Sequence, residues 1–185
     1  SLWTDAGLTL SRVTDIIHIY PTGTVPGPAN DVVPAHDINF VTDIVFQARD
    51  NVSDTLTVDF SGGDPIPDNP PAPGGVTFDG GSGIGTDALE LIGTATSVVH
   101  DFAGNGDGTV TVDGSTLAYS SLEPISDLLT AVNRTFNFSA ADDVVTLADT
   151  LLPGDGRSEL ISPSNFTGMT FDGPSGTLTI DLGQG

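Results

Sequence analysis

Aspartates that stand in glycine-rich turns are the residues of this chain best suited to chemistry. Carboxylate oxygens are the ligands that Ca2+ prefers, and a nearby glycine lets the backbone turn tightly around an ion. Four such aspartates are candidate ligands, and calcium is the cofactor that they imply: Asp79, Asp87, Asp107 and Asp113. The alternative is that each forms an ordinary turn, because an Asp side chain also accepts hydrogen bonds from the backbone of its own turn.

Two segments carry these aspartates. Residues 80–91, GGSGIGTDALEL, are a degenerate form of the nonapeptide whose stacked turns share calcium ions. Two extra residues precede Asp87, and no second copy follows in tandem. Residues 103–114 contain the inner aspartates of an EF-hand loop, but Ala103 and Gly114 occupy its two ends. An ordinary turn is therefore favoured for both segments.

Four Asn-x-Ser/Thr sequons are potential acceptors of N-linked glycans. They begin at Asn51, Asn133, Asn137 and Asn165. One or two sequons would arise by chance in a chain so rich in Ser and Thr. Glycosylation is therefore a hypothesis that rests on the sequons alone.

No arrangement of residues predicts catalysis. The chain has no Gly-x-Ser-x-Gly elbow for a nucleophilic serine and no cysteine. Its histidines, His18, His36 and His100, lack the spacing of a zinc site and are expected to be structural. The chain is therefore expected not to be an enzyme. A carbohydrate-active β-helix enzyme is the alternative, and it would need clustered aspartates for acid–base work.

The charge of the chain excludes several classes of partner. Its 185 residues include 25 acidic and only four basic side chains, for a formal net charge of −21. Nucleic acid is not expected to bind, because the chain could not replace phosphate counterions. Membrane insertion is not expected either, because no apolar run reaches the roughly 20 residues of a membrane span. Without cysteine, stability must come from burial and backbone hydrogen bonds.

Short apolar stretches between Gly, Pro, Asp and Asn turns predict an all-β fold. Strict alternation on both sides of Asp113 and Gly114 predicts a two-residue hairpin turn within a small antiparallel meander over residues 97–120. Residues 122–132 are the one candidate helix, because four of their apolar side chains would share a helical face. A strand is the alternative there.

Two phrases of the sequence occur twice. TLTVDFSGG at 55–63 returns as TLTIDLGQG at 177–185, and VTFDGGSG at 76–83 returns as MTFDGPSG at 169–176. Such echoes at the scale of one strand and one turn are typical of repeat proteins, in which each rung buries only part of a core.

The longer spacing suggests a division of the chain. We interpret residues 64–185 as one complete repeat unit and residues 1–63 as the tail of a preceding unit, continuous with it. Phe78 and Phe171 are then expected at equivalent inward positions. The predicted architecture is a β-solenoid, a parallel β-helix-like stack that includes the small antiparallel meander. Tandem β-sandwiches are the alternative.

Several phrases in residues 54–185 resemble the tandem repeats of very large secreted surface proteins of planctomycete-like bacteria. The most specific of them is DGSTLAYSSLEPI, at 113–125, and others are DTLTVDFSGG at 54–63 and GTLTIDLGQG at 176–185. The resemblance implies a secreted, repeat-built protein of the cell surface. It also implies a role in adhesion or surface structure, without catalysis.

The sequence as a whole predicts a structural or adhesive repeat segment of a secreted bacterial surface protein or extracellular fibre. A carbohydrate-active β-helix enzyme and a calcium-dependent binding module are the alternatives. The expected partners are further copies of the chain, joined end to end as tandem units or as a filament, and surface carbohydrate.

Overall fold

The computed structural model describes residues 7–67, 75–104, 106–138, 144–162 and 166–183. The fold is all-β, with 57% of residues in strands and 2% in helix. The one helical turn in these ranges is η1 (Ile38–Phe40), where the Asp37 carboxylate accepts a hydrogen bond from the Asn39 N–H at 2.9 Å. The prediction of an all-β protein is confirmed.

Two of the strands are much longer than the others and bend. These are β7 (Ala88–Gly104) and β10 (Ile125–Asn137). The shorter strands are β1 (Leu8–Val13), β2 (Ile16–Pro21), β3 (His36–Asp37), β4 (Asp43–Gln47), β5 (Thr55–Asp59), β6 (Gly75–Asp79), β8 (Asp107–Val112), β9 (Ser115–Ser120), β11 (Thr146–Asp149), β12 (Arg157–Ser162), β13 (Phe166–Asp172) and β14 (Thr177–Asp181).

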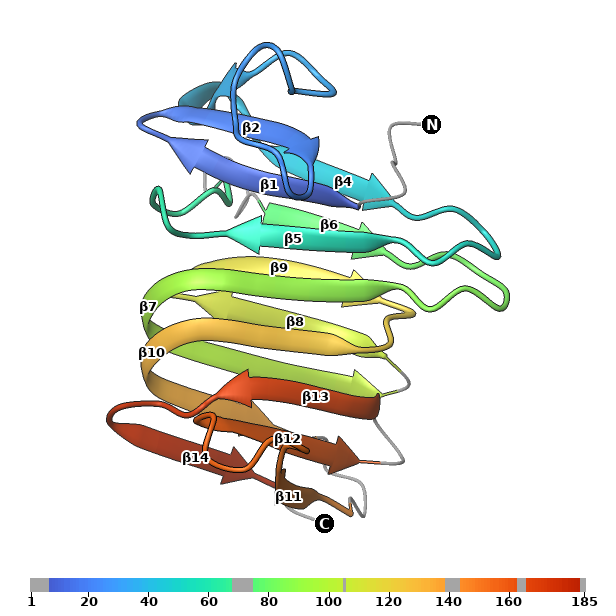
Figure 1. The fold of residues 1–185 in the computed structure, drawn as a ribbon, viewed down its shortest axis with the longest axis vertical. Coiled ribbons are helices and arrows are strands. Elements are labelled where there is room, and N and C mark those ends of the chain that lie inside the picture. The colour runs from blue at the N-terminus through green and yellow to red at the C-terminus, as the bar shows by residue number, and fades with distance from the viewer. Residues whose placement is uncertain (1–6, 68–74, 105, 139–143, 163–165, 184–185) are drawn as a thin grey trace.

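The strands form one mixed sheet that curls into an open half-barrel (Figure 1). We call one side of the curl the front half, in the order β11-β12-β13-β10-β7-β5-β1-β2-β3. The back half contains β4, β6, β9 and β8, then the second parts of β7 and β10, and finally β14. The two long strands therefore join the halves.

A glycine allows β7 to pass from one half to the other. Before the bend β7 runs parallel to β5, and after it β7 runs antiparallel to β8. Gly93 lies at the bend with φ +112°, a conformation that L-residues with a side chain rarely adopt. A Cβ atom there would lie 2.7 Å from the backbone N of Ser61. The curl thus depends on the absence of a side chain at this position.

The core lies between the two halves, where alternate side chains of each strand point inward. Register partners in successive strands form buried rows that run across the sheet. In the front half one such row consists of Leu8, Leu56, Leu89, Ile125 and Met169. In the back half a buried row is aromatic and consists of Phe46, Phe78 and Tyr119.

The meander predicted over residues 97–120 is confirmed. β7, β8 and β9 are antiparallel neighbours, and β8 and β9 are joined by Asp113 and Gly114 alone. These residues have φ values of +50° and +107°. Positive φ at both positions matches the turn to the right-handed twist of the strands, which is why the Asp-Gly pair is a strong hairpin signal.

Residues 122–132 do not form the candidate helix, and the strand alternative is the one that the structure shows. Their larger part belongs to β10, where Ile125, Asp127, Leu129 and Ala131 are buried in strict alternation. β10 pairs with β7 on one side and with β13 on the other, so its backbone is satisfied by neighbours. A helix of this length would gain little stability of its own.

Of the predicted architecture only the all-β class is confirmed, and the solenoid is not. Among the described strands, seven pairs are parallel and six are antiparallel, so the fold is a curled open mixed sheet. Strands from both sides of the expected boundary between residues 63 and 64 share this sheet, because β4 pairs with β6 and β5 with β7. Residues on both sides of that boundary therefore share one sheet, and the division into repeat units stays a prediction.

The repeated phrases do not occupy equivalent places. Phe78 and Phe171 are both fully buried, but β6 lies in the back half and β13 in the front half. TLTVD forms β5 inside the sheet, where Leu56 is fully buried, whereas TLTID forms β14 at an edge, where Leu178 is 37% exposed. What the two phrases share is the alternation of polar and apolar residues that is typical of a strand with one face toward the core.

Candidate functional site

Three of the four predicted calcium ligands stabilise turns. Asp79 accepts a hydrogen bond from the Gly81 N–H at 3.0 Å, and Asp107 accepts one from the Ser121 N–H at 2.8 Å. Asp113 binds the N–H groups of two successive residues, 96 and 97, at 3.0 and 2.8 Å. The bond of Asp79 lies within its own turn, as in the ordinary-turn interpretation, whereas Asp107 and Asp113 hold N–H groups of distant segments.

Asp87 lies in a different setting, since it is only 5% exposed. Its Oδ1 accepts a hydrogen bond from the Asp54 N–H at 2.8 Å, one rung away in the front half. Asp54 is in turn held by Arg49, whose Nη2 lies 2.5 Å from its Oδ1. Burial raises the pKa of Asp87, and the negative charge of the nearby Asp54 carboxylate adds to this effect. The hydrogen bond from the Asp54 N–H lowers the pKa but is outweighed.

The loops that carry these residues stack on one another. Ser82 donates from its N–H and its hydroxyl to the Asp50 carboxylate, and the Ser53 and Thr86 hydroxyls are 3.1 Å apart. Residues 80–87 therefore do form a stacked turn, as the nonapeptide likeness suggests. The stacking uses hydrogen bonds between side chains as well as bonds from backbone N–H groups to side chains.

A polar hollow of about 260 Å³ lies against this turn. Asp87 and Glu123 contribute carboxyl groups to it, and the remaining lining comes from Ser121 and from Gly80, Gly81, Ser82, Gly83 and Gly85. Among the described residues no three His, Asp or Glu side chains converge as a metal site. Of the four predicted ligands only Asp87 lines the hollow. Calcium binding stays a prediction.

The predicted glycosylation sites differ in accessibility. Asn51 lies in an exposed loop with φ +60°. Asn133 and Asn137 belong to β10, where Asn133 Oδ1 accepts from the Thr177 N–H at 3.3 Å and Asn137 donates to Asp101 at 2.8 Å. Asn165 lies outside the described residues. A glycan on Asn137 Nδ2 would displace the hydrogen bond to Asp101, whereas Asn51 and Asn133 are both exposed.

The strongest polar cluster is one that the sequence did not indicate. Asp127 occupies a front-half row whose other members, Leu10, Val58, Leu91 and Phe171, are apolar. Arg134 lies across the bend of β10 and binds Asp127 with two hydrogen bonds of 2.8 Å, from Nε and Nη2. The third member is His100, which stands 2.9 Å from Asp127 Oδ2 through Nε2.

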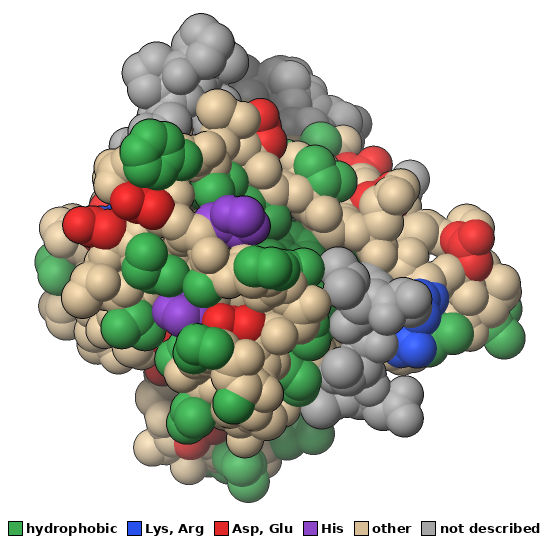
Figure 2. Space-filling view, turned by 90° about the horizontal axis from the view of Figure 1, so that it is seen from above, with side chains coloured by type: hydrophobic (Ala, Val, Ile, Leu, Met, Phe, Trp, Pro, Cys, Tyr) green, Lys and Arg blue, Asp and Glu red, His purple; other side chains and the backbone are tan. Residues whose placement is uncertain are grey.

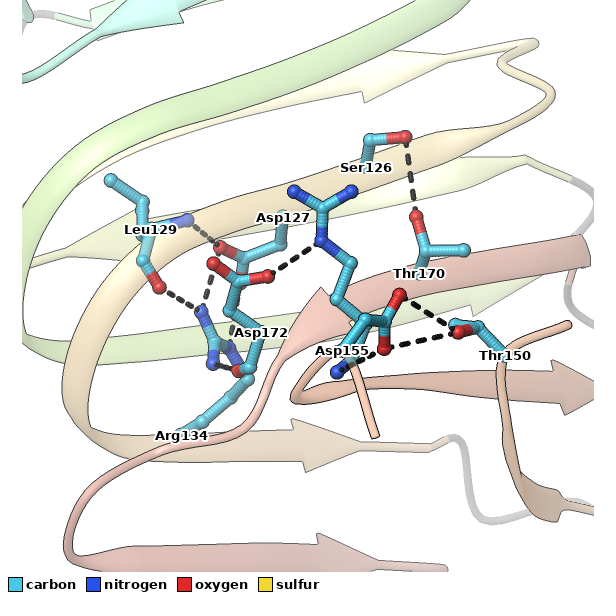
Figure 3. Close-up of polar contacts among 9 residues, drawn as sticks. Ser126, Asp127, Leu129, Arg134, Thr150, Asp155, Thr170 and Asp172 are labelled. Carbon is cyan, nitrogen blue, oxygen red and sulfur yellow. Dashed lines mark hydrogen bonds and ion pairs between the residues drawn. The ribbon is translucent and has the colours of Figure 1, made fainter. Parts of the chain in front are cut away.

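Contacts of Arg134 with backbone carbonyl oxygens, shown in Figure 3, and with an aromatic ring complete this cluster. Arg134 also donates to the carbonyl oxygens of Leu129, at 3.0 Å, and Asp172, and its guanidinium lies 5.6 Å from the ring centre of Phe171. Burial favours a higher pKa for Asp127, but the hydrogen bonds and charges of His100 and Arg134 outweigh it, so the pKa is lowered.

The cluster of Asp127, Arg134 and His100 has no contact with solvent. All three side chains are 0% exposed. A substrate could not reach them, although the residue types are those of acid–base chemistry. Their role is structural, and the expectation that His100 is structural agrees with its burial.

A shallow groove crosses the outer side of the front half near β12 and β13. It consists of two hollows of about 310 and 330 Å³ that share Glu159 and Thr170. One hollow adds Thr150, Leu151, Leu152, Asp155 and Arg157, and the other adds Thr86, Glu123, Pro124, Ser126 and Gly168. Figure 3 shows Thr170 joined to Ser126 and Thr150 to Asp155 along this face.

The surface of the groove is mainly apolar, with hydroxyl and carboxyl groups placed along it. Its hydroxyl and carboxyl groups could hydrogen-bond a glycan, but its lining contains no aromatic ring on which a sugar could stack. The Arg157 guanidinium is already paired with Asp172 at 3.0 Å. Carbohydrate binding in this groove stays a prediction.

The second candidate surface is the pair of edges at which the back half ends. Among the described strands β14 pairs only with β10, and β4 pairs only with β6. Figure 1 places β14 and β4 toward opposite ends of the long axis. Figure 2 looks onto the end near β1, β2 and β4, where hydrophobic side chains lie exposed among acidic ones.

Comparison of the chain with protein-family models, curated proteins and solved structures finds no match. Among the described residues no helix has the length and apolar character to cross a membrane. The function must therefore be argued from the geometry above.

Proposed function

We propose that this chain is a structural, non-catalytic segment of a secreted surface protein or extracellular fibre, and that it acts by stacking end to end with further copies. The observation that carries the proposal is the continuous sheet, which extends along the molecule and at the C-terminal end of its back half reaches β14, whose one neighbour among the described strands is β10. An unpaired strand edge is a template for another strand.

The internal construction supports the same proposal. The buried row from Leu8 to Met169 crosses five parallel strands, and each strand forms backbone hydrogen bonds with the next. In a solenoid, likewise, each rung contacts only its neighbours, and the stability is roughly the sum of the stabilities of the rungs and of the interfaces between them. We propose that the curled sheet is a short, partly antiparallel form of such a stack.

The use of the charged side chains supports a role without turnover. Arg49, Arg134 and Arg157 are each engaged with an aspartate of the same fold. Asp127, whose pKa is lowered by His100 and Arg134, is fully buried in the core. Surface carbohydrate is the second proposed partner, and the groove beside Glu159 is where it would bind. Secretion is proposed from the resemblance of the repeats.

The proposal is tested by joining two copies directly in one chain. If the copies stack, the tandem should unfold in one transition at a higher denaturant concentration than the single copy. Its denaturant dependence should approach about twice that of the single copy, because the slope follows the surface exposed on unfolding. The control is the same tandem with Leu178→Lys in the first copy.

A tandem that unfolds with the midpoint and slope of the single copy would overturn the proposal. Such a result would mean that the copies are independent. The lysine control should return the tandem to that behaviour, since it places a charge on the inward face of β14.

A further inference from the structure

We propose that this chain cleaves its own backbone between Asp64 and Pro65. The bond belongs to the one Asp-Pro pair of the sequence, and it stands a few residues after the end of β5. The reaction is a single self-processing step of each chain, without turnover, and water is the only reactant that it consumes. This inference goes beyond the proposed function and does not depend on end-to-end stacking.

The residue types at this bond suit cleavage from within the chain. An aspartate carboxylate can attack the carbonyl carbon of its own residue, because the two groups then close a five-membered ring. The leaving group at this bond is a proline nitrogen, which belongs to a tertiary amide and carries no hydrogen. Every other aspartate of the chain is followed by a residue with a backbone N–H. The chemistry therefore singles out this bond.

The Asp64 carboxyl group is held beside the bond that it would attack. Its Oδ1 accepts a hydrogen bond at 2.9 Å from the N–H of Ile66, and the ring closed by this hydrogen bond contains the bond between residues 64 and 65. Its Oδ2 accepts a hydrogen bond from the hydroxyl of Ser115, the first residue of β9. Ile66 is only 2% exposed and belongs to the hydrophobic core. A nucleophile held near its target needs little further ordering to react.

The carbonyl group of Asp64 carries a charged hydrogen-bond donor. Arg12 Nη1 donates to this oxygen at 3.2 Å, although the two residues are 52 positions apart in the sequence. Attack at the carbonyl carbon moves negative charge onto the same oxygen, and a cationic donor that is already in place stabilises this charge. The guanidinium would therefore act as the donor of an oxyanion hole does.

The fold fixes Arg12 in this position. Its Nε donates to the Thr14 carbonyl oxygen at 2.5 Å and its Nη2 to Asp15 Oδ1 at 2.8 Å, so the turn between β1 and β2 orients the guanidinium. The segment before Asp64 lies close to β1, because a Cβ atom at Gly62 would overlap the Arg12 carbonyl oxygen. The tertiary structure therefore brings donor, carbonyl group and carboxyl group together, and unfolding would separate the donor from the other two.

The proposed reaction has two steps. In the first, a carboxylate oxygen of Asp64 bonds to the carbonyl carbon of the same residue and the C–N bond breaks. The electron pair of that bond stays on the Pro65 nitrogen, which takes a proton from solvent, and residue 64 becomes a cyclic anhydride. In the second step water opens the anhydride to two carboxyl groups and returns the proton. Asp64 is half-buried, so solvent reaches it.

The cleaved protein should keep its fold. Residues 1–64 and 65–185 would stay joined by two parallel strand pairs, β4 with β6 and β5 with β7. Cleavage would thus replace a covalent link within one sheet by hydrogen bonds and core packing. In an assembly of such chains the cut would create a joint whose two parts can separate or exchange.

The test follows the intact mass of the purified chain at about pH 5, where an ordinary carboxyl group, of pKa about 3.9, is largely ionised. The folded chain should yield fragments 1–64 and 65–185 at least about tenfold faster than the same chain unfolded in urea at that pH. With hydroxylamine present, fragment 1–64 should carry a hydroxamate at residue 64, because an anhydride reacts with this nucleophile. Direct hydrolysis of the bond would leave a free acid.

Three variants serve as controls, each checked for its fold by circular dichroism. Pro65→Ala should leave the chain intact, since it keeps the carboxylate and replaces the tertiary amide. Arg12→Met should slow the cleavage at least about tenfold, whereas Arg157→Met, which changes an exposed arginine of β12, should leave the rate unchanged.

Equal rates in the folded and the unfolded chain would overturn the proposal, because the cleavage would then be the ordinary acid lability of an Asp-Pro bond. A folded chain that stays intact would overturn it too, and so would a free acid in place of the hydroxamate.

Discussion

Replacement of Arg134 by methionine should lower the free energy of unfolding by about 3–5 kcal/mol, the cost of leaving one member of a buried ion pair without its partner. Arg134 is fully buried and holds Asp127 through two hydrogen bonds. Without it the Asp127 carboxylate would keep only His100 and one backbone N–H as partners. Urea unfolding followed by circular dichroism measures the change.

Arg157→Met is the matched control for this substitution. Arg157 also pairs with an aspartate, but its side chain is 45% exposed. Exposed ion pairs contribute only about 0–1 kcal/mol. Equal effects of the two substitutions would contradict the account of the cluster. The double substitution Asp127→Leu with Arg134→Met should recover much of the loss, because its row is otherwise apolar.

The second large effect is expected in acid. His100 and Arg134 hold the pKa of Asp127 below its ordinary value against the effect of burial. A carboxyl group with a lowered folded-state pKa stabilises the fold above its unfolded pKa, which is about 3.9, and loses this contribution as the pH falls through the folded pKa. Stability should therefore fall steeply below about pH 4.

Above that range the trend should be the reverse. The acidic side chains, which give a formal net charge of −21, repel one another in the folded state. Protonation of surface carboxylates between pH 7 and pH 4 reduces this repulsion and so stabilises the fold. A maximum of stability is therefore expected on the acid side of neutrality. Urea unfolding across pH measures the profile. Asp127→Asn should reduce the acid slope by up to about 1.4 kcal/mol per pH unit, and an unchanged slope would contradict the assignment.

The parts of the fold that follow from local chemistry could be predicted from the sequence. Asp113 and Gly114 adopt positive φ because few other pairs can, and the meander follows from that turn. The sequence of residues 122–132 leaves helix and strand open, because the inward Asp127 breaks the apolar alternation that identifies a strand. Its partner Arg134 lies beyond a bend that no local pattern specifies.

The candidate site could be predicted less well, because one residue type serves two purposes. An Asp in a Gly turn can bind calcium or accept backbone hydrogen bonds, and the choice depends on which turns stack. Asp79 and Asp107 turn out to hold the N–H groups of Gly81 and Ser121. The free edges depend on which strands end the sheet, which the repeated phrases could not specify.

The mass of the intact chain in solution as a function of concentration tests the central claim most directly. Sedimentation equilibrium should be measured from micromolar to millimolar protein at high salt, which screens the negative charge that opposes contact. If copies stack end to end, the average mass should rise steadily without a plateau at the dimer, and removal of residues 177–185 should abolish the rise. A chain that stays strictly monomeric over this range would contradict the claim.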